Sequence, residues 1–460
     1  MQLTILATTL LLLTLIGFYL GRSRAVASAG GNRRQLHSLP GYHGVYVALW
    51  CGLPALFIVA LWLVVEPHVI EALVLSGLPE GMTDVGPGQL SLLINEIRNA
   101  ANGVSFFGEP NPAVVAAAER YNALHQIGFA AMGVVAAAAA IGGLAWARRR
   151  IAPNMRARNR VEKAIMAILI VLSTISVLTT IGIVLSLLFE SIRFFSRVPV
   201  TEFLFGLQWS PQTAIREDQV GSSGAFGAVP LFAGTMLITL IAMCVAVPVG
   251  LLSAIYLADY ASPRVRSVVK PVLEVLAGIP TVVYGFFAAL TVAPFVRDAG
   301  ASAGLDVASF SALAAGLVMG IMIIPYVSSL SDDVMNAVPQ TLRDGSYALG
   351  ATKSETIRQV VFPAALPGIV GAILLAVSRA IGETMIVVMA AGLAANLTAN
   401  PLEAVTTVTV QIVTLLVGDQ EFDSAKTLAA FALGLLLFCV TLILNIIALR
   451  VVRKYREKYD

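Results

Sequence analysis

Apolar runs of about 20 residues alternate with shorter polar stretches along the whole chain. An apolar helix of about 20 residues crosses a hydrocarbon core of about 30 Å, so each run predicts a membrane-spanning helix. The runs lack the alternation of a transmembrane strand. About nine spans are predicted, at Leu3–Leu20, Val45–Val65, Ile127–Ala147, Ala164–Leu188 and Leu428–Leu449, and near residues 229–258, 271–296, 309–330 and 367–392.

The composition fits a membrane protein and argues against a soluble domain. Hydrophobic residues make up 58% of the 460 residues and charged residues only 12%, against about 25% charged in soluble domains. Cys51, Cys244 and Cys439 all fall inside apolar runs, which indicates buried small side chains and no disulfide framework. The four histidines show no ligand spacing, so neither a metal site nor a cofactor is expected.

The basic residues are distributed unevenly among the polar stretches. Of the 30 lysines and arginines, 22 lie in 21–44, 148–163, 259–270, 331–366 and 449–460, and six lie in the alternating stretches 66–126, 190–228, 297–308 and 393–425. Acidic residues show the opposite bias, with eight in the first set and 17 in the second. The positive-inside rule therefore predicts an outer N-terminus and a cytoplasmic C-terminus.

A basic cytoplasmic linker, residues 148–163, divides the chain into two predicted regions. Residues 1–147 contain three spans and an extracytoplasmic loop, 66–126, and residues 164–460 contain six spans. The long loop would either cap the extra helices, the interpretation we favour, or dock an external partner. Arg22 and Arg24 follow the first apolar run instead of preceding it, which indicates a retained helix and not a cleaved signal.

Within the spans, Ala312, Gly316 and Gly320 lie four residues apart. This spacing places them on one helix face and predicts close helix packing.

The cytoplasmic stretch 331–366 separates two apolar spans with a polar but helix-compatible sequence. Pro339 and Pro363 flank its central part, and Gly350–Ala351 predicts a turn between two short helices. The simplest alternative is a solvated polar loop.

This stretch resembles the EAA loop of binding-protein-dependent ABC importers. Asp344, Gly345 and Ser346 occupy the positions of the Glu-Ala-Ala triplet, and Gly350 and Pro363 are in register with the motif. In that family the loop is a coupling helix that docks on the ATPase subunit. The resemblance therefore implies that these five residues couple the chain to an ATPase.

Further stretches resemble the phosphate-transport permeases of the PstC type. They are Gly227–Gly234, Tyr256–Pro263, Leu276–Phe287, Tyr347–Thr352 and Arg379–Met385. The resemblance implies an all-α polytopic fold with a six-helix permease core in a bacterial inner membrane, preceded here by about three extra helices. It also implies a PstA-like second permease, two PstB-like ATPases and an extracytoplasmic PstS-like phosphate-binding protein as partners.

Two charges, Arg379 and Glu383, fall within a predicted span. Arg379 is about 12 residues from the start of that span, or about 18 Å deep. A charge at this depth costs about 2.5–3.5 kcal/mol on insertion scales, which indicates a wet path or a packed bundle interior. Spacing i, i+4 would put both residues on one helical face. The pair is then either an internal ion pair or, as we favour, an anion waypoint.

The phosphate-permease resemblance supports the waypoint, because Arg379 and Glu383 match that family's intramembrane charges. The guanidinium has paired donors for phosphate oxygens. The Glu383 carboxylate would hold Arg379 in position and accept a hydrogen bond from HPO₄²⁻, which sulfate cannot donate.

One further acidic residue, Glu274, lies near Lys270 and predicts an ion pair at a helix end. The neighbouring Gly278-Ile279-Pro280 sequence is expected to interrupt the helix, which makes Gly278 and Pro280 candidate gate residues.

The sequence contains no ATP site, because Ala351 occupies the lysine position of the P-loop spacing that starts at Gly345. No nucleophile–base constellation is recognisable and the basic stretches lack interleaved aromatics, so neither an enzyme nor a nucleic-acid-binding protein is predicted. The leading function is a permease subunit for inorganic phosphate. Alternatives are a permease for molybdate or sulfate, a secondary transporter, or a membrane sensor or scaffold that signals external phosphate to a cytoplasmic kinase.

Overall fold

The computed structural model describes residues 2–78, 87–103, 112–213, 223–417 and 424–455. The chain forms two compact units, Met1–Val177 and Leu178–Asp460, and the boundary between them falls inside helix α5, Ala157–Phe195. Almost every described element is helical, as predicted. The exception is an antiparallel hairpin of strands β1, Trp209–Thr213, and β2, Ser223–Phe226.

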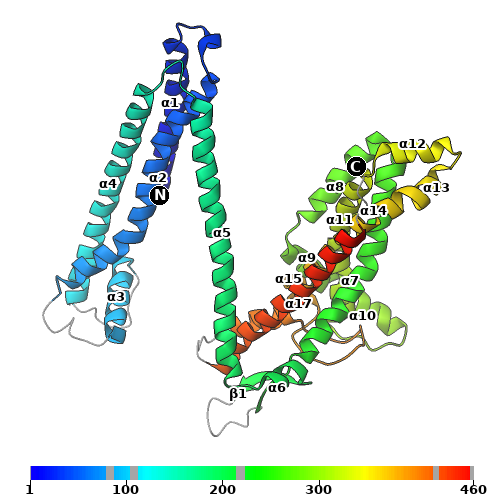
Figure 1. Ribbon diagram of the computed structural model, residues 1–460. Coiled ribbons are helices and arrows are strands. Elements are labelled where there is room, and N and C mark those ends of the chain that lie inside the picture. Colours follow the sequence, from blue (N-terminus) through cyan, green and yellow to red (C-terminus); the bar gives the residue numbers. More distant parts are fainter. Residues whose placement is uncertain (1, 79–86, 104–111, 214–222, 418–423, 456–460) are drawn as a thin grey trace. The chain divides into compact units, whose positions relative to one another are not determined.

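In the first unit three long helices, α1, α2 and α4, pack against one another (Figure 1). The elements of this unit are α1 Gln2–Ser28, η1 Arg33–Gln35, α2 Pro40–Leu75, α3 Pro87–Ala101, α4 Pro112–Arg149 and the first part of α5. Glycines allow the close approach of these helices. A β-carbon at Gly143 of α4 would clash with the carbonyl oxygen of Trp50 on α2, and one at Gly44 would lie 2.7 Å from the carbonyl oxygen of Phe18.

The helices beside the predicted extracytoplasmic loop are longer than their apolar runs. α2 continues to Leu75 and α4 begins at Pro112, so only residues 76–111 connect them. Helix α3 occupies the middle of this connection and packs against α4. Residues 79–86 and 104–111 of the predicted loop lie outside the described residues.

The second unit contains the remaining elements. They are α6 Val200–Phe205, the hairpin, α7 Val229–Ile255, η2 Tyr256–Tyr260, α8 Pro263–Ala277, α9 Thr281–Phe287, η3 Ala288–Val292, α10 Ala293–Ser302, α11 Ala312–Asn336, α12 Gln340–Ala348, α13 Lys353–Thr356, η4 Ile357–Val361, α14 Phe362–Ile381, α15 Met385–Ala390, α16 Val408–Leu416 and α17 Ala425–Tyr455. The turns η2, η3 and η4 are π-helical.

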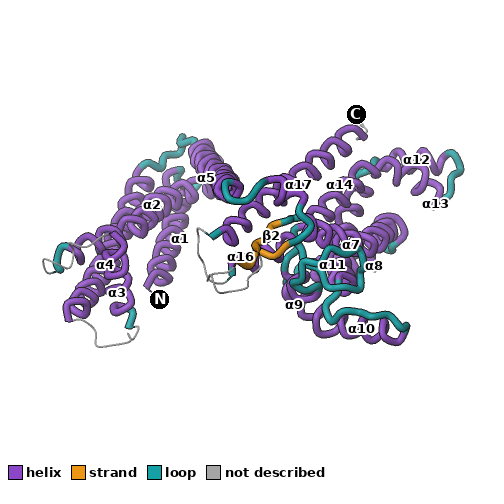
Figure 2. Tube along the Cα trace, turned by 90° about the horizontal axis from the view of Figure 1, so that it is seen from below, coloured by secondary structure: helices purple, strands orange, loops and turns teal. Residues whose placement is uncertain are grey.

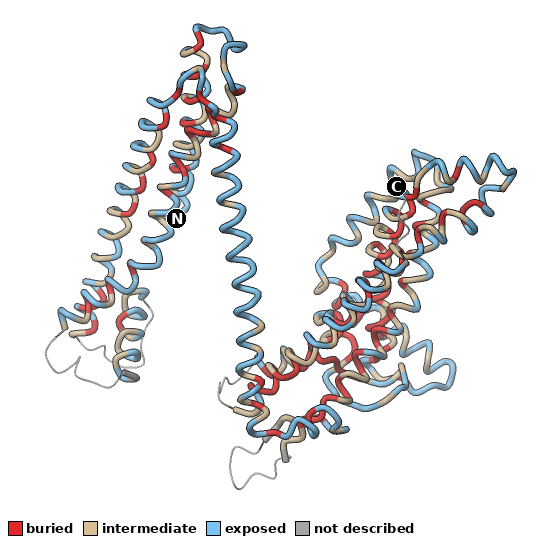
Figure 3. Tube along the Cα trace, viewed as in Figure 1, coloured by how far each residue is buried: buried red, intermediate tan, exposed pale blue. Residues whose placement is uncertain are grey.

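Helix α11 is the centre of the second unit and the most deeply buried of the candidate spans (Figure 3). It packs on α7 along the predicted stripe of small residues. Ala312 is fully buried, and a β-carbon at Gly316 would lie 2.6 Å from Cγ2 of Ile241. At Gly320 the same atom would lie 2.9 Å from the carbonyl oxygen of Ala242. The prediction of close helix packing at this stripe is therefore confirmed.

Nine helical segments among the described residues are long and apolar enough to cross a membrane, in agreement with the predicted number. Two of them differ from the sequence prediction in position. The span expected at 271–296 covers Thr281–Ser302, and the one expected at 367–392 covers Lys353–Ile381. The later start of the first span follows from a helix break at 278–280, and the earlier end of the second follows from a break at 382–384. Both breaks belong to the candidate site.

Candidate translocation site and coupling loop

The helix that carries Arg379 ends sooner than the sequence indicates. α14 stops at Ile381, Gly382 caps it, and α15 begins at Met385. Oε1 of Glu383 accepts hydrogen bonds from the backbone N–H of Met385, at 3.0 Å, and of Ile386, at 3.5 Å. Glycine weakens a helix, and a carboxylate that binds free N–H groups favours a new helical start. The prediction that Arg379 and Glu383 share one continuous helical face is therefore wrong.

Arg379 and Glu383 do not stabilise each other, and each is stabilised by backbone groups. Arg379 lies in the last turn of α14, where the negative end of the helix dipole favours a cation. Glu383 occupies the equivalent favourable position before α15, with its carboxylate on backbone N–H groups. No acidic side chain in the described part of the chain forms an ion pair with Arg379. The ion-pair interpretation thus has no counterpart in this geometry.

The guanidinium of Arg379 faces an open surface of the second unit. Its Cζ lies 5.7 Å from the ring centroid of Tyr326 on α11, a cation–π arrangement. Arg379 and Leu375, one turn earlier on α14, are both exposed. Tyr326 could not be predicted as a neighbour of Arg379, because it lies on another helix and a tyrosine is ordinary in a membrane span. The hydrogen-bond donors of the guanidinium are free to bind an anion.

A second break, at Gly278-Ile279-Pro280, separates α8 from α9. The interruption predicted there is confirmed, with Gly278 as the cap of α8 and Pro280 preceding α9. The hydroxyl of Tyr284 donates a hydrogen bond of 2.9 Å to the carbonyl oxygen of Leu276 and so spans the break.

The two broken helices pack against each other. A β-carbon at Gly285 of α9 would lie 2.6 Å from Sδ of Met389 and 3.1 Å from the carbonyl oxygen of Met385, both on α15. The breaks at 278–280 and 382–384 are thereby joined through α9 and α15. A movement at one break would be transmitted to the segment that Glu383 starts, which is the geometry that a gate needs. The gate role of Gly278 and Pro280 stays a prediction.

The expected ion pair between Glu274 and Lys270 does not form. Nζ of Lys270 contacts Asp332 at 2.9 Å and Asp333 at 3.1 Å, both near the end of α11. Nη2 of Arg266 lies 3.0 Å from the same Asp332 carboxylate, which is nearly fully buried. The hydrogen bond with Asp332 raises the pKa of Lys270, so this ammonium stays charged at physiological pH. The sequence missed this cluster because α11 continues past the apolar run to Asn336.

Replacing Asp332 with asparagine is expected to destabilise the second unit by about 2–3 kcal/mol. Loss of one partner of a buried ion pair costs about 3–5 kcal/mol, and the lower figure applies because Arg266 and Lys270 are 32% and 30% exposed. Thermal unfolding of the purified chain in detergent measures the change. Asp333→Asn is the matched control, since that side chain is 63% exposed. Equal melting temperatures for the two variants would contradict the prediction.

The predicted cytoplasmic stretch folds as two short helices. α12 and α13 lie side by side (Figure 2) and are connected through Gly350, whose φ of 87° belongs to the left-handed region that glycine favours. Thr352 and Glu355 form a capping box at the start of α13. The predicted turn at Gly350–Ala351 is therefore confirmed.

The five residues in register with the EAA loop occupy defined places in this helical pair. Asp344, Gly345, Gly350 and Pro363 are exposed, and Ser346 is half-buried. The Ser346 and Thr356 hydroxyls are hydrogen-bonded to each other at 2.9 Å and so link α12 with α13. Asp344 accepts a hydrogen bond of 3.0 Å from the Gln340 amide.

The tip of the helical pair is apolar and open. Leu349 is 91% exposed and Tyr347 is 41% exposed. These two side chains are therefore available for contact with another protein.

A buried arginine that no sequence motif indicated anchors α12 to the rest of the unit. Arg343 forms an ion pair with Asp259 of η2, and it donates a hydrogen bond of 2.9 Å to the carbonyl oxygen of Met335. Both charged side chains are nearly buried, with exposures of 11% and 5%. The anchor ties the exposed tip to α7 and α11, so force on the tip would reach the central helices.

The chain is similar to known transport proteins. Residues 246–457 match the family described as binding-protein-dependent transport system inner membrane component, and residues 7–107 match the family described as phosphate ATP-binding cassette transporter. The probable ABC transporter permease protein YqgH of Bacillus subtilis is 34% identical over 240 residues, which are 52% of this chain and 74% of YqgH.

The phosphate transport system permease protein PstC 1 of Mycobacterium tuberculosis is 32% identical over 284 residues, covering 55% of this chain and 81% of that protein. Among solved structures, the MetNI methionine ABC transporter in an inward-facing conformation matches 50% of this chain and 95% of its own, at 18% identity and a TM-score of 0.38.

The helical fold and these matches define the class of the protein, a membrane-spanning permease component of an ABC importer. Within that class, the chain belongs to the family of PstC phosphate transport permeases. Proteins of this family are transport components and not enzymes, and they work with an ATPase and a substrate-binding protein. The chain is accordingly a multi-span membrane protein with such partners.

Proposed function

We propose that this chain forms half of the translocation path for inorganic phosphate in an ATP-driven importer. A PstA-like permease would supply the other half, two PstB-like ATPases would hydrolyse ATP, and an extracytoplasmic PstS-like protein would deliver phosphate. The observation that carries the proposal is the Arg379 guanidinium, which is exposed within a candidate span and has no acidic partner among the described residues. The names of the relatives support phosphate as the anion.

The proposed arrangement assigns a role to each part of the chain. Residues 164–460 would be the permease domain, with 331–366 as its coupling loop, and residues 1–147 with loop 66–126 would be an extension joined by the basic linker 148–163. The N-terminus would be outside and the C-terminus cytoplasmic. This orientation would put the exposed tip around Leu349 in the cytoplasm, where an ATPase could bind it.

The proposed coupling to the ATPase rests on two features of the α12–α13 pair, an exposed surface and a buried anchor. Asp344, Gly345, Ser346, Gly350 and Pro363 would present or shape the surface that the ATPase contacts. The Arg343–Asp259 ion pair would carry the movement to α7. The gate residues Gly278 and Pro280 lie in the break that follows α8, which itself holds α11 through Asp332.

Uptake by the reconstituted importer tests the proposal. The chain is assembled in proteoliposomes with a PstA-like permease, a PstB-like ATPase and a PstS-like binding protein, and radiolabelled phosphate is followed with and without ATP. ATP-dependent phosphate uptake that excess sulfate or molybdate does not suppress is expected. Uptake of sulfate or molybdate in its place would establish the alternative oxyanion permease, and uptake without ATP would establish a secondary transporter.

A signalling role is a second candidate, supported by the extension that precedes the permease domain. Deleting residues 1–150 and measuring uptake and the phosphate response of the cell separately distinguishes the two. Loss of the response with intact uptake would make the extension the part that reports external phosphate to a cytoplasmic kinase.

Replacing Glu383 with glutamine is expected to lower the preference for phosphate over sulfate about fivefold, close to the value of one modest hydrogen bond. The glutamine oxygen still accepts from the backbone N–H of Met385, so α15 starts as before. The second carboxylate oxygen, which would accept the hydrogen bond from HPO₄²⁻, becomes an NH₂ group that donates to sulfate as readily as to phosphate. The ratio of initial uptake rates measures the effect. The control is Glu403→Gln, since the Glu403 carboxylate accepts a hydrogen bond from the Asn400 amide and belongs to neither helix break. An unchanged ratio would remove Glu383 from substrate selection.

A further inference from the structure

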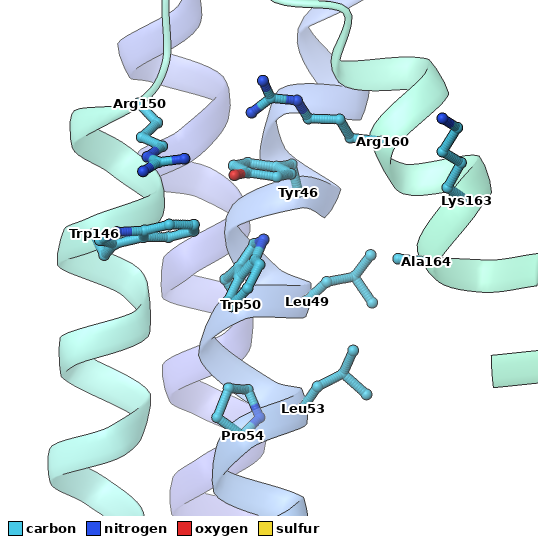
Figure 4. Close-up of a pocket in the computed structure, with 10 residues that line it drawn as sticks. All are labelled: Tyr46, Leu49, Trp50, Leu53, Pro54, Trp146, Arg150, Arg160, Lys163 and Ala164. Atoms are coloured by element: carbon cyan, nitrogen blue, oxygen red, sulfur yellow. The ribbon is translucent and has the colours of Figure 1, made fainter. Parts of the chain in front are cut away.

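Three basic side chains line one cavity of the first unit. The cavity has a volume of about 410 Å³ and is formed by α2, the end of α4 and the start of α5. Arg150 follows directly after α4, Arg160 extends from α5 toward Tyr46, and Lys163 lies about one turn further along α5 (Figure 4). This cavity lies far along the sequence from Arg379 and belongs to the part of the chain that the transport proposal leaves without a site.

Aromatic rings hold the two arginines at the rim. Cζ of Arg150 lies 4.2 Å from the centroid of the Trp146 ring, and Trp146 in turn lies 4.5 Å from Trp50, measured between ring centroids. Cζ of Arg160 lies 6.0 Å from the centroid of the Tyr46 ring. Such contacts fix a guanidinium without neutralising its charge. The tryptophans are the residues that membrane–water interfaces favour.

The positive charge at the rim has no acidic counterpart in the described part of the chain. The nearby carboxylate of Glu162 accepts a hydrogen bond of 2.6 Å from Arg158 and is therefore already paired. Arg150, Arg160 and Lys163 form no ion pair with any described acidic side chain, and all three are exposed. A rim of three free cations selects an anion.

Below the rim the cavity is apolar. Leu49, Leu53 and Pro54 of α2 and Ala164 of α5 line it, and Leu53 is 39% exposed (Figure 4). A small hydrophilic anion would gain nothing from this wall. A molecule with an anionic head and a hydrocarbon tail would contact both parts, and the wall belongs to a helix long and apolar enough to cross the membrane.

We infer that this cavity is a binding site for an anionic phospholipid of the surrounding membrane. The phosphate of the headgroup would lie between Arg150, Arg160 and Lys163, and one acyl chain would extend along Leu49 and Leu53. The bound lipid would connect α2, α4 and α5 at the basic linker. A polar headgroup that carries no net charge would lack the attraction of the rim.

Native mass spectrometry of the full-length chain in detergent tests the inference. The chain is titrated with phosphatidylglycerol or with phosphatidylcholine carrying the same acyl chains. Each cation near an anionic lipid changes the association constant about fivefold, so R150Q/R160Q is expected to weaken phosphatidylglycerol binding about 25-fold. Binding of phosphatidylcholine should not change. The matched control R148Q/R149Q removes the same charge from neighbouring arginines that do not line the cavity and should retain the lipid.

A measurement on the unmodified chain guards against misfolded variants. Brominated phosphatidylglycerol should quench the tryptophan fluorescence more than brominated phosphatidylcholine at equal concentration, because Trp50 and Trp146 border the cavity. Inorganic phosphate at millimolar concentration should not displace the lipid. Equal quenching by the two lipids, equal loss of binding in both double variants, or displacement by inorganic phosphate would each overturn the inference.

Discussion

Replacing Arg379 with glutamine is expected to lower ATP-dependent phosphate uptake about hundredfold, because two charge-assisted hydrogen bonds to the anion are lost at about 1.5 kcal/mol or more each. The side chain is exposed and no described acidic residue forms an ion pair with it. Its removal therefore leaves no buried charge behind. The amount of assembled transporter in the membrane should stay the same.

Two further variants separate the geometry of the guanidinium from its charge. Arg379→Lys keeps the charge but has no planar pair of donors, so intermediate uptake is expected. Arg297→Gln removes an exposed arginine on α10 that contacts Asp298, and it should leave uptake unchanged. Initial rates of radiolabelled phosphate uptake, normalised to transporter content, measure all three. Normal uptake by Arg379→Gln would end the proposal that the anion passes this residue.

Most of the spans could be located from the sequence, because a helix that crosses the membrane must be apolar over about 20 consecutive residues. Runs such as Val45–Val65 lie within helices that the structure extends at both ends, here Pro40–Leu75. The packing stripe from Ala312 to Gly320 was also predictable, since small residues at spacing four have one common use in a bundle. Local rules of this kind need no knowledge of which helices are neighbours.

The helix break after Ile381 shows where such rules fail. Apolar residues continue on both sides of Gly382, so the run reads as one span. The break depends on the Glu383 carboxylate binding the N–H groups of Met385 and Ile386 instead of a neighbouring arginine. Spacing i, i+4 indicates an ion pair only when the helix is continuous. The sequence sign of the break was Gly382 followed by the acidic Glu383.

The ion pairs of the second unit could not be predicted without knowledge of the fold. Lys270 binds Asp332 across 62 positions of the sequence, and Arg343 binds Asp259 across 84. Each of these residues has an ordinary interpretation as an exposed loop charge. Only the approach of α8 to α11, and of α12 to η2, turns them into buried or half-buried pairs.

Replacing Arg343 with methionine is expected to uncouple ATP hydrolysis from uptake. The change leaves the Asp259 carboxylate buried without its partner, which costs about 3–5 kcal/mol, and it removes the hydrogen bond to the carbonyl oxygen of Met335. α12 then loses its anchor while the exposed tip at Leu349 can still bind the ATPase. ATP hydrolysis and phosphate uptake are measured in the same proteoliposomes. The number of ATP molecules hydrolysed per phosphate taken up should rise at least tenfold.

The double variant R343M/D259N decides whether the anchor acts through this ion pair. Removing both charges leaves no unpaired buried carboxylate, so the double variant should regain most of the stability that R343M loses. The difference between the double variant and the sum of the two single variants gives the interaction energy of the pair. Coupling should stay impaired, because no ion pair then connects α12 with η2. If the double variant recovers stability and also couples normally, force passes to the central helices by another contact, and Arg343 is only a structural residue.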